Sequence, residues 1–203
     1  MLGPFKDTIQ GVISFTWPMV LISAVILASF RICYLVKNHE KIIIYKELSM
    51  LIFGIYILCL FQIVTFQDDV SWSTNNFIPF KEILRYDISS RLFIKNVLGN
   101  MLLFLPFGFF TSLYLKVEKM HLPIILTLIA SILIEIVQMC IGRVFDVDDI
   151  ILNLIGGILG FAVYNLLKKI GNKLPDFCKK EWFLDTISIM ILIFLIVGII
   201  IIL

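Results

Sequence analysis

Long apolar runs alternate with shorter polar segments along the whole chain. A helix that crosses the hydrocarbon layer of a membrane needs about 20 mostly apolar residues. Six runs satisfy this condition, at residues 11–30, 48–66, 97–115, 122–141, 150–167 and 186–203. The pattern therefore predicts an all-α, polytopic membrane protein with about six transmembrane helices, forming a single membrane domain over residues 1–203.

The connection between the second and third runs, residues 67–96, is the longest and contains the sequence STNNFIPFKEILRY. Pro79 is suited to the first turn of a helix. A helix that begins there has an apolar side formed by Phe77, Phe80, Ile83 and Leu84. We expect a short interfacial helix that covers the layer of polar residues described below, and a solvated loop remains the alternative.

The composition agrees with a membrane protein. The mean hydropathy is +1.03 and charged residues make up 16% of the chain, against about 25% in ordinary soluble domains. The net charge of +2 gives no indication of nucleic-acid binding. The sequence contains neither a P-loop nor a GxGxxG motif, and we predict no cofactor.

Basic residues are distributed unevenly between the two faces of the membrane. The connections after the first, third and fifth runs contain ten lysines, whereas the opposite face has six lysines and arginines. Because basic residues favour the cytoplasmic side, we predict a cell-membrane protein with both termini outside.

Polar residues concentrate in one stretch, IEIVQMCIGRVFDVDDIILN, at residues 134–153. The alternation of helices brings its polar groups to the same membrane face as Asn96 and Asn100, which begin the third helix. An ionisable residue within a membrane helix is costly and indicates a functional site. Glu135 is the first candidate, and the guanidinium of Arg143 is its natural partner. An ion pair that only holds helices together is the alternative.

The aspartates of this stretch have two interpretations. Asp148 or Asp149 is expected to cap the helix that follows and to complement its positive end, whereas Asp146 precedes the first turn. Carboxylate oxygens also suit magnesium or calcium, but the spacing is not that of an EF-hand. We therefore predict no metal site and treat a cation as the minority interpretation.

Three glycines follow in the sequence NLIGGILG. Gly156 and Gly160 form a small-xxx-small face, which allows a second helix to approach closely. We expect these glycines to serve in helix packing.

Three motifs in this order, NNFIPF, NVLGNMLLFLPFGFF and IEIVQMCIGRVFDVDDIILNLIGGILG, resemble the VanZ-like family of bacterial membrane proteins. The resemblance covers residues 48–167. The family is named for a teicoplanin-resistance protein of glycopeptide-resistance clusters. The positions that carry the resemblance are Asn75, Pro79, Phe80, Asn96, Asn100, Phe104, Pro106, Gly108, Glu135, Gln138, Arg143, Asp146, Asp148, Asp149, Asn153, Gly156, Gly157 and Gly160.

The resemblance implies an envelope protein that lowers susceptibility to glycopeptide antibiotics through a polar site in the outer leaflet. Its expected partners are membrane lipids, a lipid-linked cell-wall precursor or the glycopeptide itself. The alternatives are a membrane-embedded enzyme with carboxylate acid/base chemistry and, third, a small transporter. The candidate catalytic residues are Glu135, Arg143 and Asp146, and the candidate binding residues are Asn96, Asn100, Gln138, Asp148, Asp149 and Asn153. Whether the protein is an enzyme, and its oligomeric state, stay open at this point.

The topology can be tested by single-cysteine labelling in a background without the native cysteines. We expect Asn75→Cys and Phe145→Cys to react with an impermeant thiol reagent on intact cells, and Gly171→Cys to remain unlabelled, because of the basic-residue bias. Labelling of Gly171→Cys alone would invert the topology and place the polar stretch on the cytoplasmic side.

Overall fold

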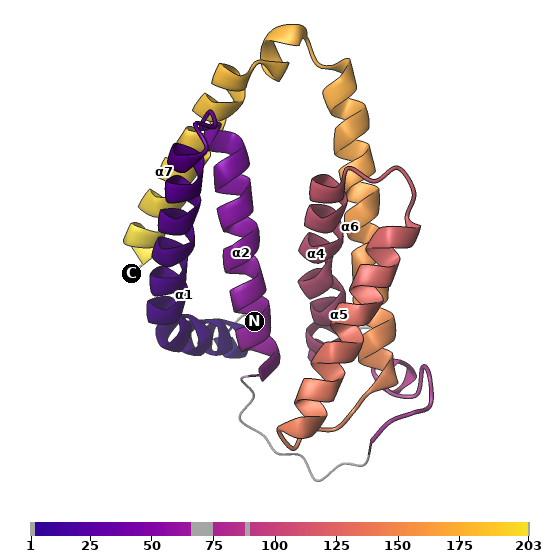
Figure 1. The fold of residues 1–203 in the computed structure, drawn as a ribbon. Helices are drawn as coiled ribbons and strands as arrows, with labels where there is room; N and C mark the ends of the chain where they lie inside the picture. Colours follow the sequence, from indigo (N-terminus) through magenta and orange to yellow (C-terminus); the bar gives the residue numbers. More distant parts are fainter. Residues whose placement is uncertain (1–2, 66–74, 88–89, 203) are drawn as a thin grey trace. The chain divides into compact units, whose positions relative to one another are not determined.

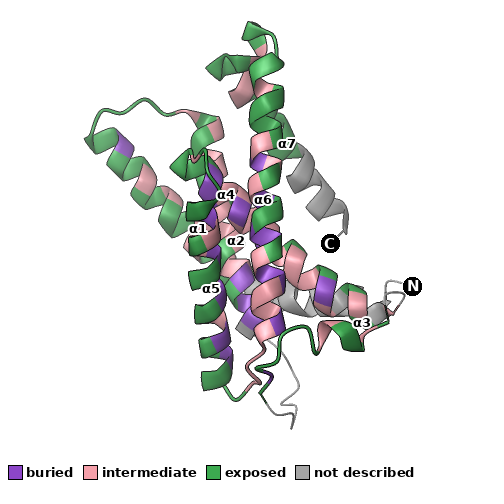
Figure 2. Cartoon of the chain, turned by 90° about the vertical axis from the view of Figure 1, so that its right-hand side faces the viewer, coloured by how far each residue is buried: buried purple, intermediate pink, exposed green. Residues whose placement is uncertain are grey.

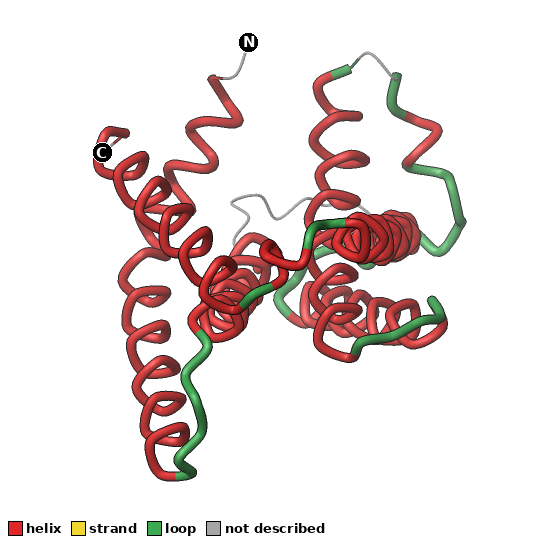
Figure 3. The backbone as a smooth tube through the Cα atoms, turned by 90° about the horizontal axis from the view of Figure 1, so that it is seen from above, coloured by secondary structure: helices red, strands yellow, loops and turns green. Residues whose placement is uncertain are grey.

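The computed structural model describes residues 3–65, 75–87 and 90–202. Its long helices are α1 (Gly3–Lys37), α2 (Ile44–Thr65), α4 (Gly99–Leu115), α5 (His121–Cys140), α6 (Val147–Lys173) and α7 (Glu181–Ile202). Shorter pieces are η1 (Ile83–Arg85), α3 (Arg91–Phe93), η2 (Ile94–Leu98) and η3 (Asp176–Lys179). The described residues form no strand, apart from an isolated bridge between Asn76 and Asp146 (Figure 3). The predicted all-α class is confirmed.

Among the described residues, five helices are long and apolar enough to cross a membrane, which confirms a multi-pass membrane protein. These spans are Trp17–Lys37, Ile44–Val64, Asn96–Leu115, His121–Cys140 and Val147–Lys173. The sixth predicted run, 186–203, falls on α7, and its part from residue 194 onward lies outside the residues whose side chains are described. The predicted interfacial helix corresponds to the single 3₁₀ turn η1.

The third predicted helix begins earlier than its apolar run. The apolar run predicts a start at residue 97, but α3 and the π-helical turn η2 lead into α4 from Arg91. Ser90 accepts a hydrogen bond from the backbone N–H of Phe93 at 3.1 Å, the geometry of a helix N-cap. The helix therefore begins at Arg91, and its first turns contain polar residues such as Asn96 that lie before the apolar run.

The chain divides into two compact units, residues 1–59 with 170–203 and residues 60–169. In the first unit, the guanidinium of Arg31 in α1 binds Glu47 of α2 through two hydrogen bonds of 2.7 and 3.0 Å. The start of α7 is tied to the same unit, because Asp185 accepts a hydrogen bond from the backbone N–H of Tyr45. That residues 1–203 form a single membrane domain stays a prediction.

In the second unit, α4, α5 and α6 lie side by side (Figure 1). Buried residues gather where these helices face one another, whereas the outward faces carry exposed apolar side chains such as Leu102, Leu133 and Leu166 (Figure 2). Exposed apolar surface of this extent is typical of contact with lipid. The polar side chains of the unit are therefore directed between the helices or toward their ends.

Glycines bring the backbones of α4 and α6 into direct contact. A Cβ atom at Gly156 would collide with the backbone carbonyl of Met101, and one at Gly160 with the carbonyl of Leu105. A Cβ atom at Gly108 would collide with the backbone of Gly157. The predicted packing role of Gly156 and Gly160 is confirmed, and Gly108 supplies the matching surface on α4.

This contact predicts opposite effects for two glycine substitutions in α6. Gly156→Ala should lower the free energy of unfolding, because overpacking against backbone costs about 1–3 kcal/mol and the neighbouring helix cannot rotate away. Gly171→Ala is the matched control, since no atom lies within 4 Å of its added Cβ, and the better helix propensity of alanine should stabilise it by about 1 kcal/mol. Thermal unfolding in detergent measures both. Equal melting temperatures for the two variants would contradict the contact.

Candidate functional site

A polar cavity lies at one end of the second unit, where α4 and α6 begin and α2 and α5 end. Its volume is about 340 Å³. Residues 75–87, here named the strap, form part of its wall. The lining consists of Ile63, Val64, Asn76, Glu82, Ile83, Arg85, Tyr86, Asn96, Val97, Asn100, Leu103, Gln138, Arg143, Val144, Asp146, Asp148, Asp149 and Leu152.

Most of the predicted site residues meet in this cavity. Seven of them line it, namely Asn96, Asn100, Gln138, Arg143, Asp146, Asp148 and Asp149. The remaining two, Glu135 and Asn153, are buried behind the lining. Asn153 of α6 donates a hydrogen bond of 2.9 Å to the hydroxyl of Ser131 in α5, so its described contact joins two helices.

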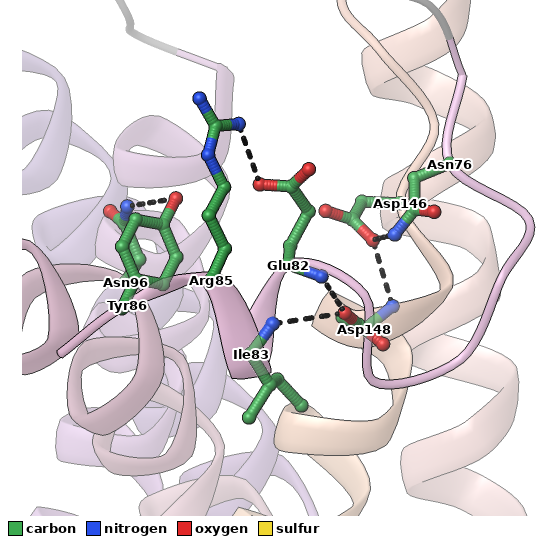
Figure 4. A network of polar contacts seen from close by, with 8 residues as sticks. All are labelled: Asn76, Glu82, Ile83, Arg85, Tyr86, Asn96, Asp146 and Asp148. Atoms are coloured by element: carbon green, nitrogen blue, oxygen red, sulfur yellow. Dashed lines mark hydrogen bonds and ion pairs between the residues drawn. The ribbon is translucent and has the colours of Figure 1, made fainter. Parts of the chain in front are cut away.

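Asp148 fastens the strap to the start of α6. Its side chain is buried, and its two carboxylate oxygens accept hydrogen bonds from the backbone N–H groups of Phe80, Glu82 and Ile83. Figure 4 shows the bonds from Glu82 and Ile83. The last two bonds measure 2.7 and 3.1 Å. A buried carboxylate requires such donors, because an unpaired charge away from water is very costly. One side chain of α6 thus accepts three backbone N–H groups of the strap.

The cap of α6 is Asp146, which corrects the expectation that Asp148 or Asp149 would serve. The helix begins at Val147, and Oδ1 of Asp146 accepts the backbone N–H of Asp148 at 2.9 Å, as an N-cap side chain does. The same oxygen accepts a hydrogen bond of 2.8 Å from the side chain of Asn76. The helix starts earlier than its apolar run predicts, so the aspartate before that run takes the cap position.

The strap also pairs with the loop before α6 through its backbone. Asn76 donates its N–H to the carbonyl of Phe145 at 2.8 Å and accepts from the N–H of Val147 at 3.1 Å. The side chain of Asn75 accepts the N–H of Phe145 at 3.0 Å. These bonds account for the isolated bridge and align the strap beside Asp146.

Arg143 and Gln138 hold the end of α2. The carbonyl of Val64 accepts hydrogen bonds from Nη1 of Arg143 at 2.6 Å and from Nε2 of Gln138 at 3.2 Å. Carbonyls in the last turn of a helix have no N–H donor within the helix. Here the side chains of Arg143 and Gln138 donate to one of these carbonyls. No ion pair among the described residues joins Glu135 to Arg143. The partner proposed for Arg143 from the sequence is therefore replaced by a backbone carbonyl.

Glu135 supports the cavity from behind. The residue is 1% exposed, and its Oε2 accepts the backbone N–H of Asp146 at 2.9 Å. This contact fixes the loop that carries Asp146 and leaves the carboxylate of Asp146 at the cavity wall. The geometry gives Glu135 a positioning contact, and a catalytic role for it stays a prediction.

Two asparagines at the start of the third transmembrane span complete the wall. Asn100 donates its side-chain N–H to Oδ1 of Asp149, which joins the first turns of α4 and α6. Asn96, in the π-helical turn η2, donates to the hydroxyl of Tyr86 in the strap at 2.9 Å (Figure 4). Single π turns occur frequently at functional sites, and this one directs Asn96 to the cavity.

The cavity has an excess of negative charge. Four carboxylates line it, those of Glu82, Asp146, Asp148 and Asp149, against the guanidinium groups of Arg85 and Arg143, which gives a formal charge of −2. Burial raises the pKa of the Asp146 carboxyl above its ordinary value, and nearby Asp148 and Glu82 raise it further. In the described part of the chain, no group of three or more His, Cys, Asp or Glu side chains could hold a metal ion.

Sequence reasoning missed the contribution of the strap. Asn76, Glu82, Arg85 and Tyr86 all line the cavity, whereas the sequence predicts only that this segment covers the polar layer and does not single out these four side chains. The available signal was the dipeptide Asn75–Asn76 before Pro79, because asparagine side chains commonly bond to nearby backbone in turns. The two asparagines predict a turn in the chain, but they do not predict that Asp148 of α6 binds the strap.

Comparison with known proteins identifies the class to which this fold and site belong. The chain is a member of the VanZ/LLP1 family, whose pattern matches residues 53–168, close to the region 48–167 expected from the motifs. No curated protein and no solved structure matches the chain. The protein is therefore a multi-pass membrane protein of the VanZ/LLP1 family.

The contact of Asp148 predicts how the strap can be released. Asp148→Ala should leave the backbone N–H groups of Phe80, Glu82 and Ile83 without their acceptor, and each unsatisfied buried group costs about 1–3 kcal/mol. Hydrogen exchange should show faster exchange across the strap, together with a lower melting temperature. Glu82→Gln is the control, because it retains the backbone N–H that Asp148 binds. Unchanged strap protection in Asp148→Ala would show that the other contacts hold the strap by themselves.

Proposed function

We propose that the protein is a cell-envelope membrane protein that binds the polar headgroup of a lipid or lipid-linked wall precursor in the cavity. Through this binding it lowers susceptibility to glycopeptide antibiotics. The proposal places the cavity at the outer leaflet, where the bias of basic residues puts the loop before α6.

The cavity is the observation that carries this proposal. Its volume of about 340 Å³ falls at the lower end of the range for small-molecule sites. Amides, carboxylates and a guanidinium group converge on it, while Ile63, Leu103 and Leu152 supply an apolar part of the wall. A mixed wall at the end of membrane helices suits a molecule with a polar head and an apolar tail.

Arg143 is the residue expected to meet an anionic group of the headgroup. Its Nη1 binds the carbonyl of Val64, and the other N–H groups of the guanidinium make no hydrogen bond to a described residue. Guanidinium groups bind phosphate and carboxylate in a bidentate manner. The carbonyl of Val64 thus holds Arg143 in place, and no described residue occupies the second edge of its guanidinium group.

Acid/base catalysis on the same headgroup is the second candidate function. The observation in its favour is Asp146, which lines the cavity and has a pKa raised by burial. A carboxyl with a raised pKa can give and take a proton closer to neutral pH. Comparative analysis of lipids and wall precursors separates the two functions, because only the enzyme changes these molecules.

Arg143→Lys tests the headgroup-binding function. We expect the variant to accumulate in the membrane at the wild-type level, since lysine can still donate to the carbonyl of Val64. Teicoplanin tolerance should fall to that of cells without the protein, because an ammonium cannot form the bidentate contact. Abundance by immunoblot and tolerance are measured together, with Arg31→Lys, outside the cavity, as the control. Full tolerance in Arg143→Lys would exclude this site.

A further inference from the structure

The charges of the cavity differ in how far the protein itself satisfies them. Both oxygens of Asp148 accept backbone N–H groups of the strap. The carboxylate of Glu82 accepts a hydrogen bond from Arg85 at 3.2 Å, and the two form an ion pair (Figure 4). These three groups are therefore engaged within the structure.

Two other carboxylates keep one oxygen each for a ligand. Asp146 uses Oδ1 for both of its hydrogen bonds, to Asn76 and to the backbone of Asp148. Asp149 uses Oδ1 for Asn100. The Oδ2 atoms of Asp146 and Asp149 receive no hydrogen bond from the described residues, and both residues line the cavity.

We propose that the headgroup bound in this cavity carries a primary ammonium group next to an anionic group. The ammonium donates its N–H groups to Asp146 and Asp149, and the anionic group contacts the free edge of Arg143. This inference rests on the proposed function and specifies the chemical class of its ligand.

Charge and hydrogen-bond capacity both favour an ammonium group over a simple anion. After the internally satisfied groups are set aside, two carboxylates face one guanidinium group, so an anion alone would add repulsion. An ammonium has three N–H donors and no acceptor, which matches two unsatisfied carboxylate oxygens. A quaternary ammonium has the same charge but cannot donate, and it should bind more weakly.

The pH dependence follows from the groups that surround Asp146. These are Glu82 of the strap, Glu135 of α5, Arg143 of the loop, and Asp148 and Asp149 of α6. Burial and the neighbouring acids raise the pKa of Asp146, so its carboxylate takes up a proton at a higher pH than an exposed aspartate. Only the ionised form attracts an ammonium group. Binding should therefore weaken as the pH falls through this raised pKa.

The experiment titrates the full-length protein in detergent with three soluble probes by calorimetry. O-phosphoethanolamine carries a primary ammonium and a phosphate, phosphocholine a quaternary ammonium and a phosphate, and glycerol 3-phosphate only the phosphate. We expect O-phosphoethanolamine to bind at least about tenfold more tightly than the other two, since a charge-assisted hydrogen bond contributes this much or more. Equal affinity for all three would overturn the ammonium assignment without any variant.

Asp146→Asn and Asp149→Asn locate the contact. Both changes are nearly isosteric, and the amide oxygen can still accept the bonds that Oδ1 now receives. Each should weaken the binding of O-phosphoethanolamine by about tenfold and should not weaken the binding of glycerol 3-phosphate, because the charge that is removed repels this anion. Asp176→Asn, which removes one negative charge from an exposed side chain outside the cavity, should change neither. Wild-type affinity in both cavity variants would overturn the assignment.

Lipid binding distinguishes a membrane lipid from a free ligand as the source of the headgroup. It also separates a failure of the ammonium inference from a failure of headgroup binding itself. Native mass spectrometry compares phosphatidylethanolamine with phosphatidylglycerol. Preference for phosphatidylethanolamine, lost in Asp146→Asn, supports a lipid source, whereas preference confined to the soluble probe supports a free ligand of the same chemistry. If the soluble probes and the lipids all bind but neither set shows a preference for the primary ammonium, the ammonium inference fails and headgroup binding stands. If no probe and no lipid binds, both proposals fail.

Discussion

Asp148 accepts three backbone N–H groups from the strap, and the architecture of the site depends on this contact. A carboxylate that is 1% exposed requires hydrogen-bond donors, because an unpaired charge away from water is very costly. The strap supplies backbone donors, and in return it is fixed across the start of α6. This contact helps to place Glu82, Arg85 and Tyr86 of the strap at the cavity wall.

The contact between α4 and α6 provides the second constraint. Glycine at positions 108, 156 and 160 removes the side chains that would separate the two backbones. At this short separation, the first turns of both helices are close enough for Asn100 to bind Asp149 directly. Packing in the apolar part of the unit thus determines the geometry of polar groups at its end, as is typical where small residues line helix interfaces.

The family match and the unit that builds the cavity cover nearly the same residues. The match extends over residues 53–168, and the unit over residues 60–169. The matched range therefore includes the positions of all the residues that line the cavity, together with Val64, whose carbonyl accepts hydrogen bonds from Arg143 and Gln138. Helix α1 and helix α7 belong to the other unit, which builds its own contacts around Arg31, Glu47 and Asp185.

The sequence by itself determined the helices, the multi-pass class, the glycine contact and the gathering of polar residues at one membrane face. Hydropathy and helical spacing are local properties, so they can be read along the chain. Tertiary structure decided which acceptor each donor meets: Asp146 caps α6, Asp148 holds the strap, and Arg143 binds Val64 and not Glu135. These partners lie up to tens of residues apart, and several acidic side chains compete for them. Only the packing of helix ends against the strap selects among aspartates that are chemically alike.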